Sequence, residues 1–441
     1  MEILIKGAQL ILSLSILIIL HELGHFIPAK YFKTRVEKFY LFFDAGFSLF
    51  KIKKGETEYG IGWLPLGGYV KIAGMIDESL DNEMDSEPQP WEFRSKPAWQ
   101  RLIIMIGGVV VNLIVGFAIY MMLLFVWGLD YVKPGNVTHG FDASPVMEKI
   151  GFQDGDQILK IDGEEPFNVM DVNKKIMIFG AKSIEVLHPD GNTQLIPLPE
   201  DTDMALFQAG EKGFEPRIID PKIDTVLPEM PAGKAGFMKG DQIIAVNGNP
   251  VEYWDEFTSV IHESKNTEVL VSVLRDGKQL ELAVTPNEEL KIGVQVDIKE
   301  EAIYTKDHKD YGFFESIGSG FGHGYNTLYG YIAQFKFVFT AKGSTGIGGF
   351  GAIGGMFPNE WNWELFWERT AMISIILAFM NILPIPALDG GHVLFLLYEI
   401  ISGKAPSDKF LTRAQIVGMI ILFGLLLYAN GLDIYRAIVG K

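Results

Sequence analysis

The sequence predicts a polytopic α-helical membrane protein with about four transmembrane helices, a membrane-associated β-hairpin region, and two tandem α+β domains inserted between the second and third helices. Three observations support this fold class. Four apolar segments approach the roughly 20 residues that a helix needs to cross a bilayer. Between the first two segments, aromatic and β-branched residues alternate in the manner of strands. The middle of the chain then repeats one motif at an interval of 85 residues, which indicates two copies of one domain.

The candidate spans lie toward the two ends of the chain, and the middle is acidic. Residues 130–310 contain 34 acidic and 18 basic residues and so carry nearly all of the net charge of −17. This charge argues against nucleic acid as a partner, and the absence of cysteine excludes disulfide and thiol chemistry. The fourth apolar run, 416–428, spans a bilayer only if it extends to about 414–432. The other expected spans are 3–29, 102–127 and 365–385.

The spans and the repeat divide the chain into eight expected segments. These are 1–33 (first span), 34–97 (β region and acidic loop), 98–128 (second span), 129–215 and 216–300 (the two repeats), 301–360 (amphipathic, glycine-rich connector), 361–401 (third span) and 402–441 (fourth span and C-terminus).

Lysine and arginine residues set the expected orientation of these spans, because they concentrate in cytoplasmic loops. Four of them follow the first span within residues 30–38, and three precede the second span within residues 94–101. Three more lie between the third and fourth spans, within residues 404–413. The loops after the first and third spans are therefore expected in the cytoplasm, with the acidic middle on the outer side.

The first span ends in the pattern His-Glu-Leu-Gly-His at residues 21–25. On a helix, His21 and His25 lie one turn apart on the same face, so two imidazoles can bind one Zn²⁺ with Glu22 beside them as general base. Ionisable residues within an apolar span are costly and usually serve a function. The alternative is that the segment leaves the membrane at Leu20 and that these three are polar residues of the interface.

Asp389 is the candidate for a third ligand, since a catalytic zinc ion usually keeps three protein ligands. It follows two prolines and precedes two glycines at the end of the third span. A carboxylate in apolar surroundings is costly unless it is paired or bound to metal, and the expected topology puts Asp389 on the same membrane side as the two histidines. Two alternatives remain: Asp389 caps the next helix, or His392 is the third ligand. For His392, packing or a hydrogen bond to one of the metal ligands is the better interpretation.

Residues 39–75 are expected to form β-hairpins with turns at Lys54-Gly55 and Gly67-Gly68, and residues 77–90 an acidic loop. The segment is apolar for a cytoplasmic loop, so we expect it to dip toward the membrane. Irregular backbone is tolerated there only where protein buries it or it lines a wet cavity. A strand edge beside a metal site would bind an extended substrate by strand addition; the alternative is a purely structural sheet.

The repeated motif occupies residues 151–163 and 236–248, which are identical at seven of 13 positions. The Gly-Asp-Gln-Ile core of each copy resembles PDZ domains in their bacterial arrangement. Such domains usually bind peptide ends or strands. The alternative is that the two domains act only as steric bulk on the outer face of the membrane.

Together these motifs resemble the site-2 protease family (peptidase family M50), in the form of bacterial regulator-of-sigma-E proteases. The resemblance rests on residues 21–25, 63–71, 96–101, the tandem repeat and 381–392, which follow the family's order along nearly the whole chain. It implies that Zn²⁺ is bound by two histidines and one aspartate and that a glutamate is the catalytic base. The residues implied are His21, His25 and Asp389 for zinc, Glu22 for the base, Asn381 for holding or polarising the substrate, and Gly67, Gly68 and Tyr69 for presenting the substrate in extended form.

The family also carries a Gly-Pro-x-x-Asn pattern in its second span. Here that stretch is Gly108-Val-Val-Val-Asn112, so the proline is absent, while Asn112 stands as a further candidate for substrate binding.

The resemblance implies an intramembrane zinc endopeptidase of the bacterial inner membrane, with the active site toward the cytoplasm and the PDZ domains in the periplasm. The implied substrates are single-span membrane proteins, such as anti-sigma factors and remnant signal peptides, cut after another protease has trimmed them. The PDZ domains would bind peptides or act as a size filter, and the lipid bilayer is the remaining partner. Two other functions compete: a non-proteolytic PDZ scaffold or quality-control protein with a degenerate metal site, which would not need Glu22, and a zinc peptidase of soluble peptides, which the apolar setting disfavours.

Overall fold

The computed structural model describes residues 1–65, 67–75 and 87–439. The chain divides into two compact units. The membrane unit comprises Met1–Gly128 and Asp310–Lys441, and the repeat unit comprises Leu129–Lys309. Each unit is described by itself.

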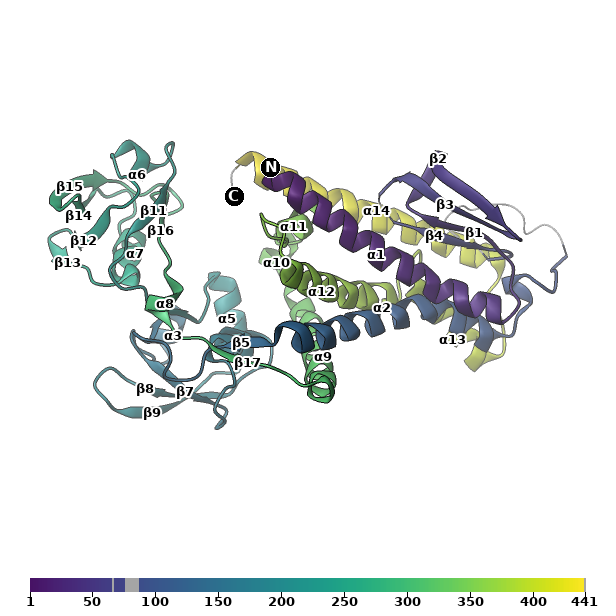
Figure 1. Ribbon diagram of the computed structural model, residues 1–441, viewed down its shortest axis with the longest axis horizontal. Helices are drawn as coiled ribbons and strands as arrows, with labels where there is room; N and C mark the ends of the chain where they lie inside the picture. Colours follow the sequence, from purple (N-terminus) through teal and green to yellow (C-terminus); the bar gives the residue numbers. More distant parts are fainter. Residues whose placement is uncertain (66, 76–86, 440–441) are drawn as a thin grey trace. The chain divides into compact units, whose positions relative to one another are not determined.

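Four helices among the described residues are long and apolar enough to cross a membrane, as the sequence predicts. They are α1 (Glu2–Tyr31), α2 (Ala98–Trp127), α12 (Trp363–Ile382) and α14 (Asp408–Val439) (Figure 1). The first three match the expected spans to within a few residues. The last is longer than the expected 414–432, because polar residues continue it: Asp433 accepts hydrogen bonds from the backbone amides of Gly349 and Ala352, both at 3.0 Å.

Helix α2 packs against α1 and α12 in the membrane unit. The contact with α1 depends on glycine. A Cβ atom on Gly107 would lie 1.9 Å from the carbonyl oxygen of Gly24, and one on Gly24 would lie 2.4 Å from that of Gly107. Small residues of this kind let helix backbones approach closely in a bilayer. Further along, Thr370 of α12 donates a buried hydrogen bond of 2.9 Å to Ser13 of α1, so polar contacts also join these helices.

The expected connector 301–360 forms several helices. Its longest, α9 (Phe313–Val338), packs along α2 and α12, and the short helices α10 (Ala341–Thr345) and α11 (Phe350–Gly355) follow. The expected third segment, 361–401, contains two helices, on either side of a break at its prolines. Residues 383–388 separate α12 from α13 (Asp389–Ser402), since two prolines remove amide donors and interrupt the helix.

A four-stranded sheet lies between α1 and α2 in sequence, with the order β2-β3-β1-β4. Strands β2 (Phe43–Lys54) and β3 (Thr57–Leu64) form the expected hairpin around Lys54-Gly55. The second expected hairpin is wrong: β4 (Tyr69–Ile72) pairs antiparallel with β1 (Val36–Leu41), and β1 in turn pairs parallel with β3.

The reason for that pairing is that the chain at Gly68 turns along α1 instead of folding back on β3. A Cβ atom on Gly68 would lie 2.5 Å from the Ile18 side chain. This path leaves β4 at one edge of the sheet. Most of the expected acidic loop 77–90 lies outside the described residues, which resume at 87.

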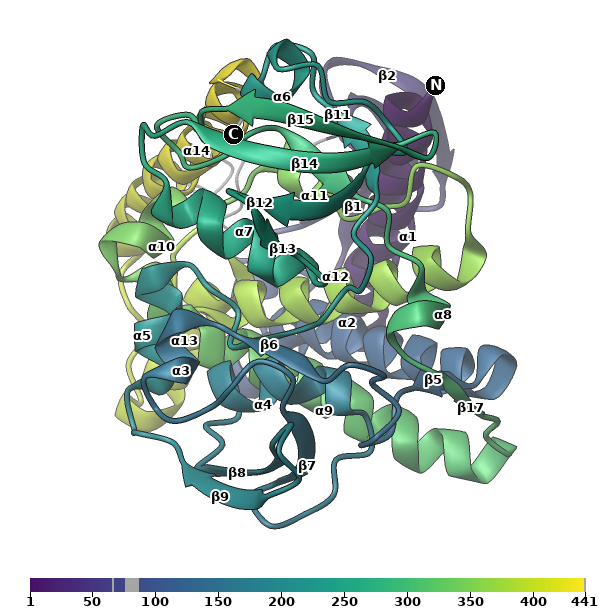
Figure 2. The ribbon, with the colours of Figure 1, turned by 90° about the vertical axis from the view of Figure 1, so that its left-hand side faces the viewer.

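The repeat unit contains two copies of one order of elements, as the offset of 85 residues predicts. The first copy runs α3 (Pro145–Glu148), β7 (Gln157–Ile161), α4 (Val172–Met177), β8 (Ser183–Leu187), β9 (Thr193–Pro197). The second runs α6 (Pro231–Lys234), β12 (Gln242–Val246), α7 (Trp254–Glu263), β14 (Val269–Arg275), β15 (Lys278–Val284), and its strands β12, β14 and β15 lie side by side (Figure 2).

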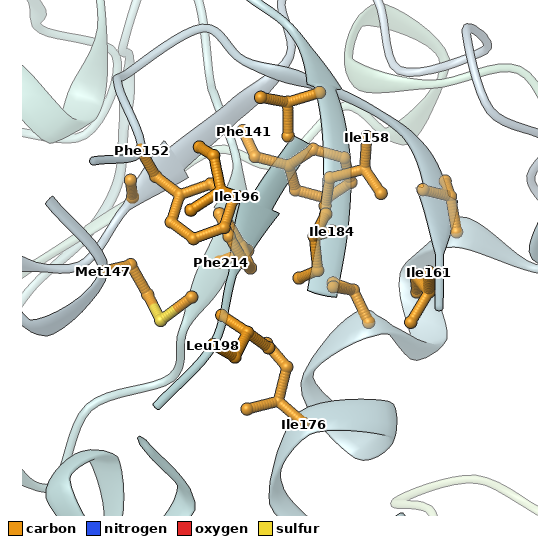
Figure 3. Packing of buried hydrophobic residues seen from close by; sticks show 14 of the residues in the cluster. Phe141, Met147, Phe152, Ile158, Ile161, Ile176, Ile184, Ile196, Leu198 and Phe214 are labelled. Atoms are coloured by element: carbon orange, nitrogen blue, oxygen red, sulfur yellow. The ribbon is translucent and has the colours of Figure 1, made fainter. Parts of the chain in front are cut away.

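Each copy has its own apolar core. Phe141, Met147, Ile158 and Phe214 are among the buried residues of the first (Figure 3), and Phe257 and five valines contribute to the second. The remaining elements among the described residues are the strands β5 (Leu129–Tyr131), β6 (Phe141–Ala143), β10 (Phe214–Pro216), β11 (Ile223–Val226), β13 (Asn249–Pro250), β16 (Val294–Val296) and β17 (Asp307–Lys309), with the helices η2 (Phe93–Ser95), η3 (Val169–Asp171), α5 (Thr202–Ala209) and α8 (Glu300–Ile303).

Candidate active site

Three side chains predicted to bind metal converge within the membrane unit. Nε2 of His21 lies 3.3 Å from Nε2 of His25, and Oδ2 of Asp389 lies 3.3 Å and 3.4 Å from those two nitrogens. Bonds of about 2.0–2.1 Å in a tetrahedron place zinc ligands about 3.3–3.4 Å apart. Oδ2 of Asp389 is also buried and accepts no hydrogen bond from any described residue. The donor set and its spacing therefore fit a zinc ion.

The local folding of two segments explains this convergence. The apolar run of α1 stays helical through residue 31, so His21 and His25 share one face. Asp389 is the first residue of α13, directly after the break that ends α12. The residue at the cap of α13 is Leu388, and no side chain caps the helix. The alternative role of Asp389 as a helix cap is therefore wrong.

A second set of contacts orients the two imidazoles. Nδ1 of His25 lies 2.9 Å from the carbonyl oxygen of Ile104. Because that oxygen only accepts, Nδ1 carries the hydrogen and Nε2 keeps its lone pair for a metal. Nδ1 of His21 lies 3.2 Å from the side-chain amide of Asn112. The contacting atom is Nδ2, while Oδ1 of Asn112 is buried without a hydrogen-bond partner. Turning the amide about its last bond brings Oδ1 to Nδ1, where it accepts from Nδ1–H and leaves Nε2 of His21 equally free.

Gly108 leaves room for both imidazoles. A Cβ atom there would lie 2.4 Å from Nε2 of His25 and 2.6 Å from Cε1 of His21. The glycine of the Gly108-to-Asn112 stretch and its asparagine therefore both contact the histidine pair. In addition, Ser374 of α12 donates to the backbone carbonyl of Asn112 at 2.7 Å, which ties this part of α2 to α12.

Glu22 faces a cavity of about 940 Å³ that also contains the three candidate ligands. Its side chain is only 9% exposed, and its Cγ lies 3.6 Å from the place a Cβ on Gly68 would take. A carboxylate next to a metal site and open to a cavity can take a proton from a water molecule and give it to a leaving group.

The substrate-binding candidates also line this cavity. Asn381 places Nδ2 3.5 Å from Nε2 of His21. Gly67, Gly68 and Tyr69 lie along the cavity wall that strand β4 continues. The hydroxyl of Tyr69 donates to Asp44 at 2.8 Å, so this side chain is held within the sheet. His392 lines the cavity too, but it is not in the group of converging ligand atoms.

Sequence reasoning missed one residue of the site, Gln415. It comes from α14, is 4% exposed, and lines the same cavity. Its Oε1 accepts a hydrogen bond of 3.2 Å from the backbone amide of Ala387, two residues before Asp389. The available signal was an amide side chain at the start of an apolar run, since polar groups at that depth need partners. Asn430, near the other end of the expected span 414–432, gives the same signal.

The sequence also matches known proteins along nearly its whole length. The sequence model of Peptidase family M50 matches residues 9–425. The "Putative zinc metalloprotease" of Vibrio cholerae is 28% identical over 464 residues, covering 99% of each chain. The "Regulator of sigma-E protease RseP" of Escherichia coli is 28% identical over 449 residues, covering 96% of this chain and 97% of its own. The "Protease RseP" of Yersinia pestis is 27% identical over 458 residues, covering 97% and 98%. The chain therefore belongs to peptidase family M50 and is a metalloprotease of the site-2 type.

Proposed function

We propose that this protein is an endopeptidase that cuts the membrane-spanning segments of single-span proteins, with His21, His25 and Asp389 as zinc ligands. The observation that carries the proposal is the spacing of their ligand atoms, 3.3–3.4 Å, in apolar helices beside a buried glutamate. Zinc bound there would supply Lewis-acid chemistry, acidifying a water molecule and polarising the scissile carbonyl.

The chain's own residues supply the proton transfers and the oxyanion contact. Glu22 takes the proton of the attacking water and passes it to the leaving amine. Asn381, next to His21, donates to the oxyanion, a contact whose removal costs about 3 kcal/mol in other hydrolases. Asn112 and the Ile104 carbonyl hold the two imidazoles in the tautomer that zinc requires.

Strand β4 is the proposed platform for the substrate. A membrane helix has its carbonyls hydrogen-bonded internally, so a substrate must unwind before attack. β4 pairs with β1 along one side only and lies at the edge of its sheet. The unwound segment would add to that edge by backbone hydrogen bonds, close to Glu22 and the metal ligands.

The two repeats are the proposed PDZ domains, and we place them on the periplasmic side of the bacterial inner membrane. The lysines and arginines flanking the spans support this orientation, which puts the metal ligands toward the cytoplasm. The repeats would bind exposed peptide ends or exclude substrates whose outer domain is still folded. Anti-sigma factors and remnant signal peptides, already cut once by another protease, are the proposed substrates; several relatives are named as regulators of sigma-E.

A cleavage assay in liposomes tests this function. The substrate is a labelled single-span protein without its outer domain, and the enzymes are the wild type, Glu22→Gln and Glu56→Gln, whose carboxylate is exposed in the sheet turn. Cleavage within the span by the wild type and Glu56→Gln, but not by Glu22→Gln, supports the proposal. Residual turnover by Glu22→Gln refutes the assignment of Glu22 as the general base. No cleavage by any zinc-loaded variant, across several single-span substrates, favours the non-proteolytic scaffold instead.

A further inference from the structure

The third proposed zinc ligand stands on a loop with an unusual backbone. Residues 383–388 connect α12 to α13. Ala387, two residues before Asp389, has φ +82°, in the left-handed region that a residue with a Cβ atom rarely adopts. Such a conformation persists only where the surrounding structure holds it. The loop therefore needs a contact that fixes Ala387.

Helix α14 supplies contacts on both sides of the Pro386–Ala387 peptide bond. Oε1 of Gln415 accepts the Ala387 amide hydrogen at 3.2 Å, and this bond is buried. Gly418, one turn further along α14, lies against the carbonyl of Pro386, where a Cβ atom would lie 1.7 Å from the oxygen. Within the loop, the Leu388 amide donates to the Ile385 carbonyl at 3.0 Å. At Ala387 the loop is held by a side chain that follows it in sequence.

The three ligands are held differently. The carbonyl of Ile104 orients His25, and Asn112 orients His21. No described residue donates a hydrogen bond to Oδ2 of Asp389. The position of Oδ2 therefore depends on the backbone of its own loop, and through that backbone on Gln415.

We propose that Gln415 is a positioning residue for the metal site: by accepting the Ala387 amide it holds the loop that brings Asp389 to the two histidines. This proposal rests on the proposed zinc site, and it adds Gln415 as a residue outside the ligand set on which zinc affinity depends. Without the acceptor, the buried amide of Ala387 loses its partner, the loop relaxes, and Asp389 moves away from His21 and His25.

Zinc affinity of the purified full-length protein in detergent, measured by competition with a fluorescent chelator, tests this inference. Gln415→Leu has nearly the same size but no acceptor and should weaken zinc binding by about 10–100-fold, as the loss of outer-shell partners does elsewhere. Gln415→Glu keeps an acceptor oxygen and should restore affinity close to that of the wild type.

The matched control is Asn430→Leu. Asn430 lies on the same helix and accepts a backbone hydrogen bond from Phe350 at 3.1 Å, so its loss disturbs α14 without touching the loop. It should leave zinc affinity unchanged. Because Gln415 acts through Asp389, the losses from Gln415→Leu and Asp389→Asn should also be less than additive when combined.

The inference is overturned by unchanged affinity in Gln415→Leu, by an equal loss in Asn430→Leu, or by fully additive losses in the double variant. The failure of the zinc site itself looks different, because Asp389→Asn would then leave affinity unchanged as well. Thermal unfolding of each variant identifies any that does not fold, and Gln415→Glu then provides the comparison: a folded Glu variant with wild-type affinity supports the role of the acceptor, and one with weak affinity contradicts it.

Discussion

Gly108 is the residue at which a single methyl group should remove the metal while leaving the fold in place. In Gly108→Ala the new Cβ atom would lie 2.4 Å from Nε2 of His25 and 2.6 Å from Cε1 of His21. Non-bonded carbon and nitrogen atoms pack at about 3.5 Å. The two rings, or α2 itself, must therefore shift by about 1 Å.

The consequence for zinc follows from the tolerance of its coordination. Ligand distances in protein zinc sites vary by about 0.2 Å, and the ligand atoms here are already 3.3–3.4 Å apart. A shift of about 1 Å in either imidazole exceeds that tolerance several times. We expect zinc affinity to fall by about 100-fold, equivalent to about 2.8 kcal/mol.

The assay is zinc content after dialysis against a weak chelator, with circular dichroism and gel filtration as checks on folding. The matched control is Gly116→Ala, on the same helix. The added Cβ there would lie 2.7 Å from Cγ1 of Ile375 and 3.1 Å from the carbonyl oxygen of Ala371, and near no histidine. Gly116→Ala should keep its zinc. A Gly108→Ala protein that is folded and retains zinc like the wild type would refute the geometry argued for this site.

Further predictions concern metal removal, the repeat unit and its pH dependence. A zinc chelator should abolish cleavage, and added Zn²⁺ but not Ca²⁺ should restore it; activity that survives chelation would contradict a metal-dependent reaction. Phe214→Ala, at a position 2% exposed in the first repeat core, should destabilise the repeat unit by about 3–5 kcal/mol, and unchanged resistance to proteolysis would argue against that core. Burial and the nearby carboxylates of Asp255 and Asp154 raise the pKa of Asp142 to about 7. The folded unit then keeps a proton that the unfolded chain loses, so stability falls as pH rises from about 4 to 7. After allowance for solvent screening, Asp142→Asn should stabilise the repeat unit by about 1–2 kcal/mol at pH 8, as measured by pulse proteolysis. Equal stability of the wild type and Asp142→Asn at pH 8 would contradict the raised pKa of Asp142. Deletion of residues 129–309 should extend cleavage to untrimmed substrates, and unaltered selectivity would count against a size filter.

The parts of the fold that the sequence predicts are those set by local pattern. Long apolar runs define the four spans, and the interval between motifs defines the two repeats. The i, i+4 spacing of His21 and His25 predicts two of the three candidate metal ligands. The sequence also predicts Asp389 as a ligand, because a carboxylate at a proline-containing break in an apolar segment is costly unless it is paired or bound to metal.

What the sequence does not predict depends on contacts between distant segments. The pairing of β4 with β1, instead of β3, follows from the packing of Gly68 on α1, which no local pattern encodes. The contact of Asn112 with His21 requires the register of two helices that pack through glycine. The role of Gln415 depends on the placement of α14 against a loop whose left-handed residue is an alanine, not the glycine that would have marked it.

The ligands of the candidate metal site come from nearly opposite ends of the chain, with His21 in the first helix and Asp389 after the third span. During synthesis, an N-terminal segment carrying both histidines and Glu22 enters the membrane long before the aspartate has been translated. A two-histidine fragment holds zinc more weakly than the complete set. The nascent chain therefore lacks the complete set of candidate ligands until nearly all of its own spans have been made.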